Sequence, residues 1–150
     1  MSAIADEAVT LARGWIGTPY RHQASVQGAG TDCLGLLRGV WRGLYGGEPE
    51  PVPAYTADWS EPEGAERLWS AAERHLVRAV APAPGQVVLF RMRAGSVAKH
   101  LGISAARDGL RTFIHAYSGH GVVESALTEP WERRIVARFD PQGAKSNHSL

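Results

Sequence analysis

A single cysteine, Cys33, and two of the histidines, His100 and His115, are the residues best suited to covalent chemistry. A lone thiol forms no internal disulfide, and without a second cysteine it is a poor structural zinc ligand. Thr31 and Asp32 are good N-cap residues, so we expect Cys33 in the first turn of a helix. Unpaired N–H groups and the helix dipole there favour the nucleophilic thiolate. The position indicates a nucleophile, with a buried structural cysteine as the alternative.

The two histidines lie on consecutive predicted strands. Side chains alternate between the two faces of a strand, so in the run 99–105 Leu101 and Ile103 share one face. His100 then lies on the other face, beside the small residues Gly102 and Ser104. His115 lies in the next β-prone run, and a short turn can bring it beside His100 if the strands are antiparallel. A second polar side chain can hold an imidazole in the tautomer that a general base needs. A hydrogen-bonded strand histidine without a catalytic role is the competing interpretation of His100.

Helices are expected in the first half of the chain. The spacing of the apolar residues predicts a first helix over 1–16, ended by Gly17 to Pro19. A second helix begins at Cys33 and stops at the Gly46-Gly47 pair. The Pro-rich segment 48–59 is expected on the surface. Ser60 and Glu63 then resemble a capping box for a third helix with the apolar face Ala65, Leu68, Trp69, Ala72 and Leu76.

Beyond Gly85 the pattern becomes that of strands, in the runs 86–93, 99–105, 112–117, 122–126 and 134–139. Helices first and an antiparallel sheet second define an α+β class. A chain of 150 residues can bury a core without disulfides or metals. We therefore expect one catalytic domain over 1–141 and a polar C-terminal tail over 142–150.

Composition narrows the classes of function. With 44% hydrophobic and 21% charged residues and a net charge of +1, the chain shows no basic stripe, so no nucleic-acid partner is expected. No apolar run approaches the roughly 20 residues that span a bilayer, so we expect no membrane insertion. The first 16 residues lack the features of a signal peptide, so we expect cytoplasmic synthesis.

Several segments, in order along nearly the whole chain, resemble motifs of the NlpC/P60 cysteine peptidases. The segment 31–36 is similar to the family's Asp-Cys-Ser-Gly-Leu motif, and 17–20 matches the Gly-x-x-Tyr that precedes it. The segment 84–90 resembles the family's Pro-Gly-Asp-Leu-hydrophobic-Phe strand. The segment 100–103 resembles His-Val-Gly-Ile, and 113–116 matches the hydrophobic-hydrophobic-His-Ala segment.

The resemblance implies a papain-like fold in which the Cys33 helix packs on an antiparallel sheet carrying both histidines. It makes Cys33 the nucleophile, His100 the base and His115 the third catalytic residue. It also implies that Tyr20 lines the oxyanion region and that Asp32 faces the free amine of a substrate. The implied reaction is hydrolysis of a peptidoglycan stem peptide, favouring the D-glutamyl–diaminopimelate bond, with no metal or other cofactor.

The amino-acid sequences of segments 32–39 and 115–124 most resemble those of cell-wall peptidases of tailed phages and gene transfer agents. This likeness implies a tail-tip or hub partner and a virion-associated protein that acts in the periplasm on entry. A structural tail-hub subunit with little activity, or a cytoplasmic stem-peptide recycling hydrolase or amidase, is the alternative.

The chain departs from the family pattern at Leu34, where many members have Ser. The insertion Glu48–Val80 matches the family's variable region, where specificity could reside.

Overall fold

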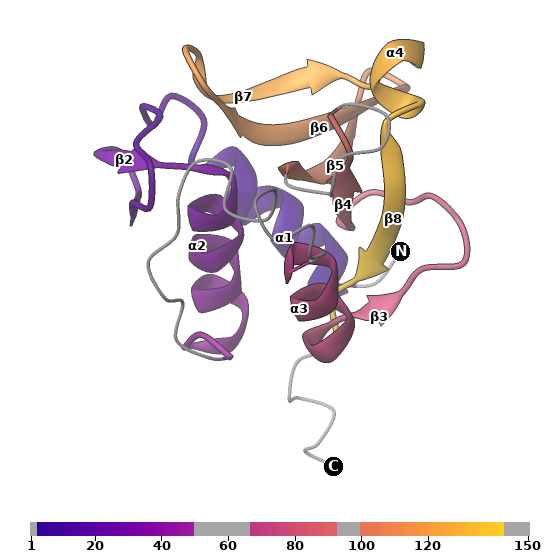
Figure 1. Cartoon of the computed structure of the whole chain (residues 1–150), viewed down its shortest axis with the longest axis horizontal. Coiled ribbons are helices and arrows are strands. Elements are labelled where there is room, and N and C mark those ends of the chain that lie inside the picture. Colours follow the sequence, from indigo (N-terminus) through magenta and orange to yellow (C-terminus); the bar gives the residue numbers. More distant parts are fainter. Residues whose placement is uncertain (1–2, 50–66, 93–99, 143–150) are drawn as a thin grey trace.

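Helices pack on one side of a twisted sheet, as the computed structural model in Figure 1 shows for residues 3–49, 67–92 and 100–142. Helices α1 (Ala3–Arg13), α2 (Cys33–Tyr45) and α3 (Arg67–His75) lie on that side. The short helix α4 (Glu129–Glu132) lies at the far end of the sheet. The α+β class predicted from the sequence is confirmed.

The main sheet has six strands in the order β3-β8-β4-β5-β6-β7, and every neighbouring pair is antiparallel. Its strands are β3 (Val77–Arg78), β4 (Val87–Phe90), β5 (His100–Arg107), β6 (Leu110–Tyr117), β7 (Gly121–Ala126) and β8 (Ile135–Asp140). A separate two-stranded ribbon pairs β1 (Ser25–Val26) with β2 (Gly30–Thr31). Strand β5 is therefore internal, and it presents both of its faces to packed side chains.

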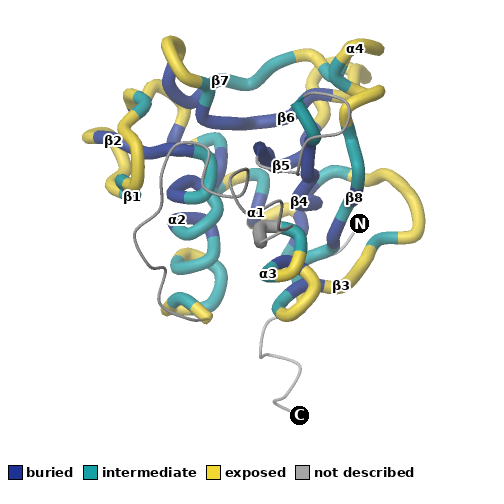
Figure 2. Tube along the Cα trace, in the orientation of Figure 1, coloured by how far each residue is buried: buried dark blue, intermediate teal, exposed yellow. Residues whose placement is uncertain are grey.

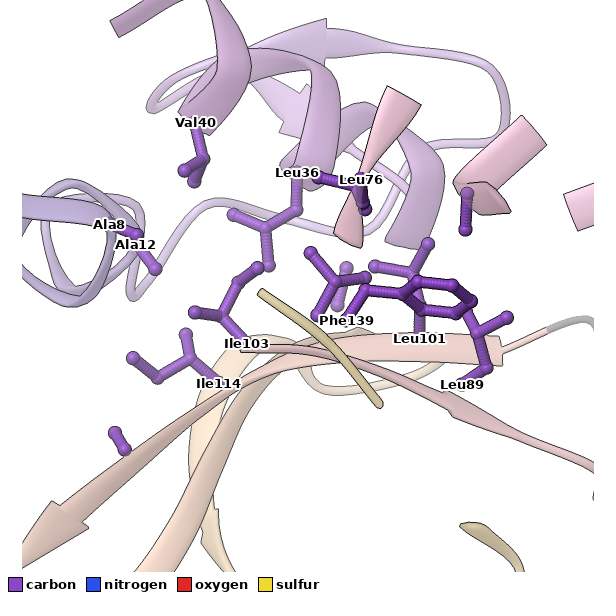
Figure 3. Close-up of a cluster of buried hydrophobic side chains, with 14 of the residues drawn as sticks. Ala8, Ala12, Leu36, Val40, Leu76, Leu89, Leu101, Ile103, Ile114 and Phe139 are labelled. Carbon is purple, nitrogen blue, oxygen red and sulfur yellow. The ribbon is translucent and has the colours of Figure 1, made fainter. Parts of the chain in front are cut away.

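The main core lies between α1, α2 and α3 and one face of the sheet (Figure 3). Leu36 and Val40 of α2 meet Leu101 and Ile103 of β5, and Ala12 of α1 joins them. Burying a Leu, Ile or Val side chain contributes about 1.5–3 kcal/mol. Figure 2 shows burial along β4, β5 and β6, and α2 contributes its buried residues Leu36 and Val40 to the same core, which holds the helix against β5.

A second cluster lies on the opposite face of the sheet. Val88, Phe90 and Phe113 are fully buried there, and Trp131 of α4 packs against them. Because side chains alternate along a strand, the neighbours of Leu101 and Ile114 face this cluster. His100 and His115 are those neighbours, so an aromatic environment surrounds both imidazoles.

The edge strand β7 is covered along part of its length by the segment that follows α1. Gly17 N–H donates to the carbonyl of Val122 at 3.0 Å, and Val122 N–H donates to the carbonyl of Thr18 at 2.9 Å. The same segment continues to Tyr20, which forms a parallel bridge with Thr31. The loop that leads to Cys33 is thus fixed both to the main sheet and to β2.

Some boundaries differ from the sequence prediction. Helix α1 ends at Arg13 and not at Ile16, because the chain turns there and Gly17 takes a positive φ of 95° to reach β7. Trp15 still packs in the core with 5% exposure. Strand β8 pairs with β4 and not with its sequence neighbour β7, and the short elements β1, β2, β3 and α4 were not predicted.

Other predictions fall mainly outside the described residues, including the 60–63 cap and most of the 48–59 excursion. In the described part of the 48–59 segment, the Glu48 carboxylate forms ion pairs with Arg38 and Arg42 of α2, each at 2.9 Å. Gln142, the first residue of the predicted tail, donates to the carbonyl of His75 at 3.1 Å. Among the described helices, none is long and apolar enough to cross a membrane.

Candidate active site

Cys33 is the first residue of α2, as the sequence predicted. Asp32 is the N-cap in extended conformation, and its Oδ1 accepts the Gly35 N–H at 2.8 Å. Gly46 ends the helix in the left-handed conformation, with φ at 86°. The capping pattern is local in sequence, which is why the start of this helix could be predicted to the residue.

The Asp32 carboxylate also holds the loop before the helix. Its Oδ2 accepts the backbone N–H of Gln23 at 2.7 Å, and Nδ1 of His22 lies 3.8 Å away. Only 4% of the Asp32 side chain is exposed. The structure thus gives Asp32 a capping role, and its place opposite a substrate amine, which the resemblance implies, stays a prediction.

Gly35 allows this loop to approach α2 closely. A Cβ at Gly35 would overlap the carbonyl oxygen of Ala24 and press on the Thr31 hydroxyl. The Ser25 hydroxyl in turn donates to the Gly35 carbonyl at 2.7 Å. The glycine of the Asp-Cys-Leu-Gly sequence is therefore required for packing the loop that carries Tyr20.

Tyr20 lies near enough to Cys33 for the charge of the thiol to act on its phenol, and its role in an oxyanion region stays a prediction. Burial, with added effects from the charges of Cys33 and Asp32, raises the pKa of the Tyr20 phenol to about 12. The phenol therefore keeps its proton near neutral pH and can donate a hydrogen bond. A neutral donor next to the nucleophile is the group that stabilises an oxyanion.

The two histidines contact each other directly. His100 Nε2 and His115 Nδ1 are 2.9 Å apart, and the rings meet edge to face. His115 Nε2 lies 3.0 Å from the Ser125 hydroxyl. Phe113 and Trp131 pack on the ring of His115, at centroid distances of 4.1 and 5.4 Å. The predicted pairing of the two strand histidines is confirmed, within a largely apolar surround.

Gly102 makes this pairing possible. A Cβ there would lie 3.0 Å from the carbonyl oxygen of Ile114, 3.1 Å from the Phe113 ring and 3.2 Å from Cβ of His115. Such contacts are tighter than ordinary packing, so any side chain would push β6 away. The small residue two places after His100 therefore holds His115 at hydrogen-bonding distance.

Burial sets the protonation of the catalytic candidates. It lowers the pKa of His100 to about 4. It also lowers the pKa of His115 to about 3, with further lowering by charge on His100 and His120. Burial, and then the Asp32 carboxylate, raise the pKa of the Cys33 thiol to about 12. Both imidazoles and the thiol are therefore neutral near pH 7.

A neutral thiol corrects the expectation that the helix start alone yields a thiolate. The backbone N–H groups of Leu101, Leu34 and Cys33 do lower the pKa of the thiol, but burial outweighs them. The proton of Cys33 must then pass to a base as the sulfur attacks. Near neutral pH the thiol therefore rests in its protonated form.

The backbone of β5 relates the thiol to His100. The Leu101 N–H faces the Cys33 sulfur, which places the sulfur beside the residue that follows His100. Nε2 of His100 is hydrogen-bonded to His115. The other ring nitrogen of His100, Nδ1, lies nearer the main chain and is the one that could accept the thiol proton. A thiol and an imidazole on neighbouring elements are the groups that acyl transfer by a cysteine nucleophile and a histidine base requires.

Sequence reasoning missed Ser125 and Trp131. Ser125 meets His115 only because β6 and β7 pair with Phe113 opposite Ser125, and nothing local in the sequence gives that register. His120, expected in solvent, is exposed but stacks on Tyr117 at 5.1 Å. In the described ranges, no group of three or more His, Cys, Asp or Glu side chains could hold a metal ion.

The buried histidines should make the protein acid-sensitive. Between about pH 6.5 and 4, the unfolded chain takes up protons at His100 and His115 while the folded chain does not, so stability falls as pH falls. One pKa unit corresponds to about 1.4 kcal/mol, so we expect each histidine to contribute a loss of about 3 kcal/mol over this window, and the pair a loss on the order of 6 kcal/mol. Denaturant unfolding at a series of pH values measures it.

The control for this measurement is the double variant H100N/H115N, which should show a flatter dependence above pH 4.5. The Glu124 carboxylate, whose pKa is lowered to about 2 by its bonds to Arg13, Arg107 and Thr112, loses its contribution only below that pH. Equal pH slopes for parent and double variant would contradict the assigned protonation states.

The chain is similar to proteins of known class. No family model matches it. It is 32% identical over 121 residues to the murein DD-endopeptidase MepS/murein LD-carboxypeptidase of Escherichia coli strain K12. The match covers 80% of this chain and 54% of MepS, so the chain spans about half the length of this curated relative.

Solved structures share the fold. An NlpC/P60 family protein from Bacillus cereus has a TM-score of 0.60 at 18% identity, over 89% of this chain and 39% of that one. A protein similar to a lipoprotein of the NLP/P60 family, from Staphylococcus aureus, has a TM-score of 0.55 at 16% identity. This match covers 93% of the present chain and 42% of the other.

Proposed function

We propose that the chain is a cysteine peptidase of the NlpC/P60 kind that hydrolyses amide bonds in peptidoglycan stem peptides. The observation that carries the proposal is the hydrogen-bonded pair His100–His115 on the strands beside the thiol at the start of α2. Similarity to a murein endopeptidase supports the substrate class.

The chemistry follows from the protonation states. The Cys33 sulfur attacks the amide carbonyl while its proton moves to Nδ1 of His100. Tyr20 and the Cys33 backbone N–H donate to the oxyanion, and the loss of one such donor costs about 10²–10³ in rate. His100 then passes the proton to the leaving amine, and water, deprotonated by the same imidazole, hydrolyses the thioester.

Two amide bonds are candidates for cleavage. The favoured one joins D-glutamate to diaminopimelate, on the resemblance of the motifs around Cys33 and His100. The second is a cross-link between two stem peptides, because the relative MepS is a murein DD-endopeptidase. Both bonds require the same nucleophile and base, so the choice depends on the surface around the site.

Defined muropeptides distinguish these bonds. We expect monomeric muropeptides to lose the part of the stem beyond D-glutamate, with a new free amine on diaminopimelate detected by mass spectrometry. Conversion of cross-linked dimers to intact monomers would instead assign a cross-link endopeptidase. If neither substrate were cleaved under conditions where Cys33 reacts with iodoacetamide, the structural alternative with little activity would be favoured.

We also propose that the protein is made in the cytoplasm and reaches the periplasm as part of a phage-like tail tip or hub. The similarity of 32–39 and 115–124 to peptidases of tailed phages and gene transfer agents supports this context. Attachment to a particle would raise the effective concentration of the catalytic domain at the wall.

Particle composition tests the tail proposal. We expect purified particles to contain the protein in a small fixed number at the tail tip, and deletion to impair entry or assembly. A C33A chain should still be incorporated, which separates assembly from activity. Detection of the protein only free in the cytoplasm, and not in particles, would favour a role in stem-peptide recycling.

A further inference from the structure

We propose that Ser125 is a positioning residue that sets the tautomer of His115 and, through it, the competence of His100 as a base; this inference rests on the proposed function. The Ser125 hydroxyl lies 3.0 Å from His115 Nε2, and His115 Nδ1 lies 2.9 Å from His100 Nε2. Three side chains from β5, β6 and β7 thus form one chain of hydrogen bonds.

The direction of this chain decides whether His100 can accept a proton. For Nδ1 of His100 to be unprotonated, its Nε2 must carry the hydrogen and donate to Nδ1 of His115. His115 then carries its hydrogen on Nε2 and donates to the Ser125 oxygen. In the reverse direction the Ser125 hydroxyl donates to Nε2 of His115, and Nδ1 of His115 donates to Nε2 of His100. The hydrogen of His100 then lies on Nδ1, which cannot act as a base.

The surroundings give Ser125 this influence. His115 is 1% exposed, and Phe113 and Trp131 pack on its ring. Sheet register places Ser125 opposite Phe113 and therefore diagonal to His115 on the same face. An acceptor at His115 Nε2 also favours the transient state in which His100 has taken the Cys33 proton, since burial opposes positive charge there.

Alkylation of Cys33 by iodoacetamide measures the effect without any peptidoglycan. We expect S125A to slow alkylation at neutral pH by about 3- to 10-fold, the value of one hydrogen bond. S125T keeps a hydroxyl and should restore the rate to within about 2-fold of the parent. The matched control is S118A, an exposed serine in the turn between β6 and β7, which should leave the rate unchanged.

A double-variant comparison separates positioning from general structure. In an H115A background, S125A should have no further effect on the alkylation rate, because its partner is absent. The same fold-loss in both backgrounds, a parent rate in S125A, or failure of S125T to restore the rate in a folded protein would each overturn the proposal.

The two proposals fail separately. If the parent chain left all muropeptides intact but showed the Ser125-dependent alkylation, the peptidase assignment would fail and the tautomer inference would stand. If muropeptides were cleaved and alkylation were indifferent to Ser125, the inference would fail alone. Cleavage of muropeptides by S125A should fall by the same factor as alkylation, with the loss in kcat rather than in KM.

Discussion

Replacing Cys33 with alanine is expected to abolish the proposed muropeptide hydrolysis and to leave the fold intact. Cys33 is the only thiol of the chain, so no other side chain can form the thioester. Loss of a catalytic nucleophile typically costs on the order of 10⁴- to 10⁶-fold in kcat. The expected cost in stability is about 1 kcal/mol, because a small side chain at a helix start loses one partly buried sulfur.

The measurement for Cys33 is product formation by mass spectrometry beside thermal unfolding of the same sample. C33S is a useful companion, because it keeps the shape but offers a hydroxyl that is harder to deprotonate. Hydrolysis near the parent rate in a folded C33A protein would eliminate covalent catalysis. A hydrolytic mechanism with an activated water would then have to be considered.

Replacing His100 with alanine should cost more than replacing His115. Removal of the base eliminates proton transfer, which is worth about 10²–10⁴ in rate. Loss of His115 leaves His100 in place but without its partner at 2.9 Å, so we expect a loss of about 10- to 100-fold. H115N should retain part of the activity, because an amide oxygen can still accept from Nε2 of His100.

Kinetics at several pH values on folded variants separate these roles. His75 on α3 contacts Trp41 rather than the histidine pair, so H75A serves as the control and should keep the parent kcat. Equal losses in H100A, H115A and H115N would contradict the division between base and orienting residue. An alkylation rate of Cys33 that did not depend on His100 would show that the thiol has another base.

The start of α2 and the pairing of the two histidines could be predicted because each depends on short-range patterns. An Asx cap acts over three residues, and β5 and β6 are joined by a tight turn at Asp108 and Gly109, so their antiparallel pairing follows from the sequence. The alternation of Leu101 with His100 then placed the imidazole on the correct face.

The remaining features depend on distant parts of the chain. Strand β8 pairs with β4 and not with β7, its neighbour in sequence, and no local sequence pattern specifies this pairing. The neutral state of Cys33 follows from burial against the sheet, whereas its sequence neighbours alone favour a thiolate. Ser125 is an ordinary strand residue until the register of β6 and β7 brings it to His115. Tertiary packing therefore decides the electrostatics of the site.

The hydrogen bonds between the 17–18 segment and Val122 also bear on aggregation. An uncovered edge strand offers unpaired backbone groups to a second chain, and proteins that avoid intermolecular pairing cover such edges. At the other edge of the described sheet, β3 has only two residues and offers little to pair with. Since the segment that covers β7 continues to Tyr20, its release would expose the edge and displace this proposed oxyanion donor together. Loss of activity and onset of aggregation should therefore share one unfolding step in this chain.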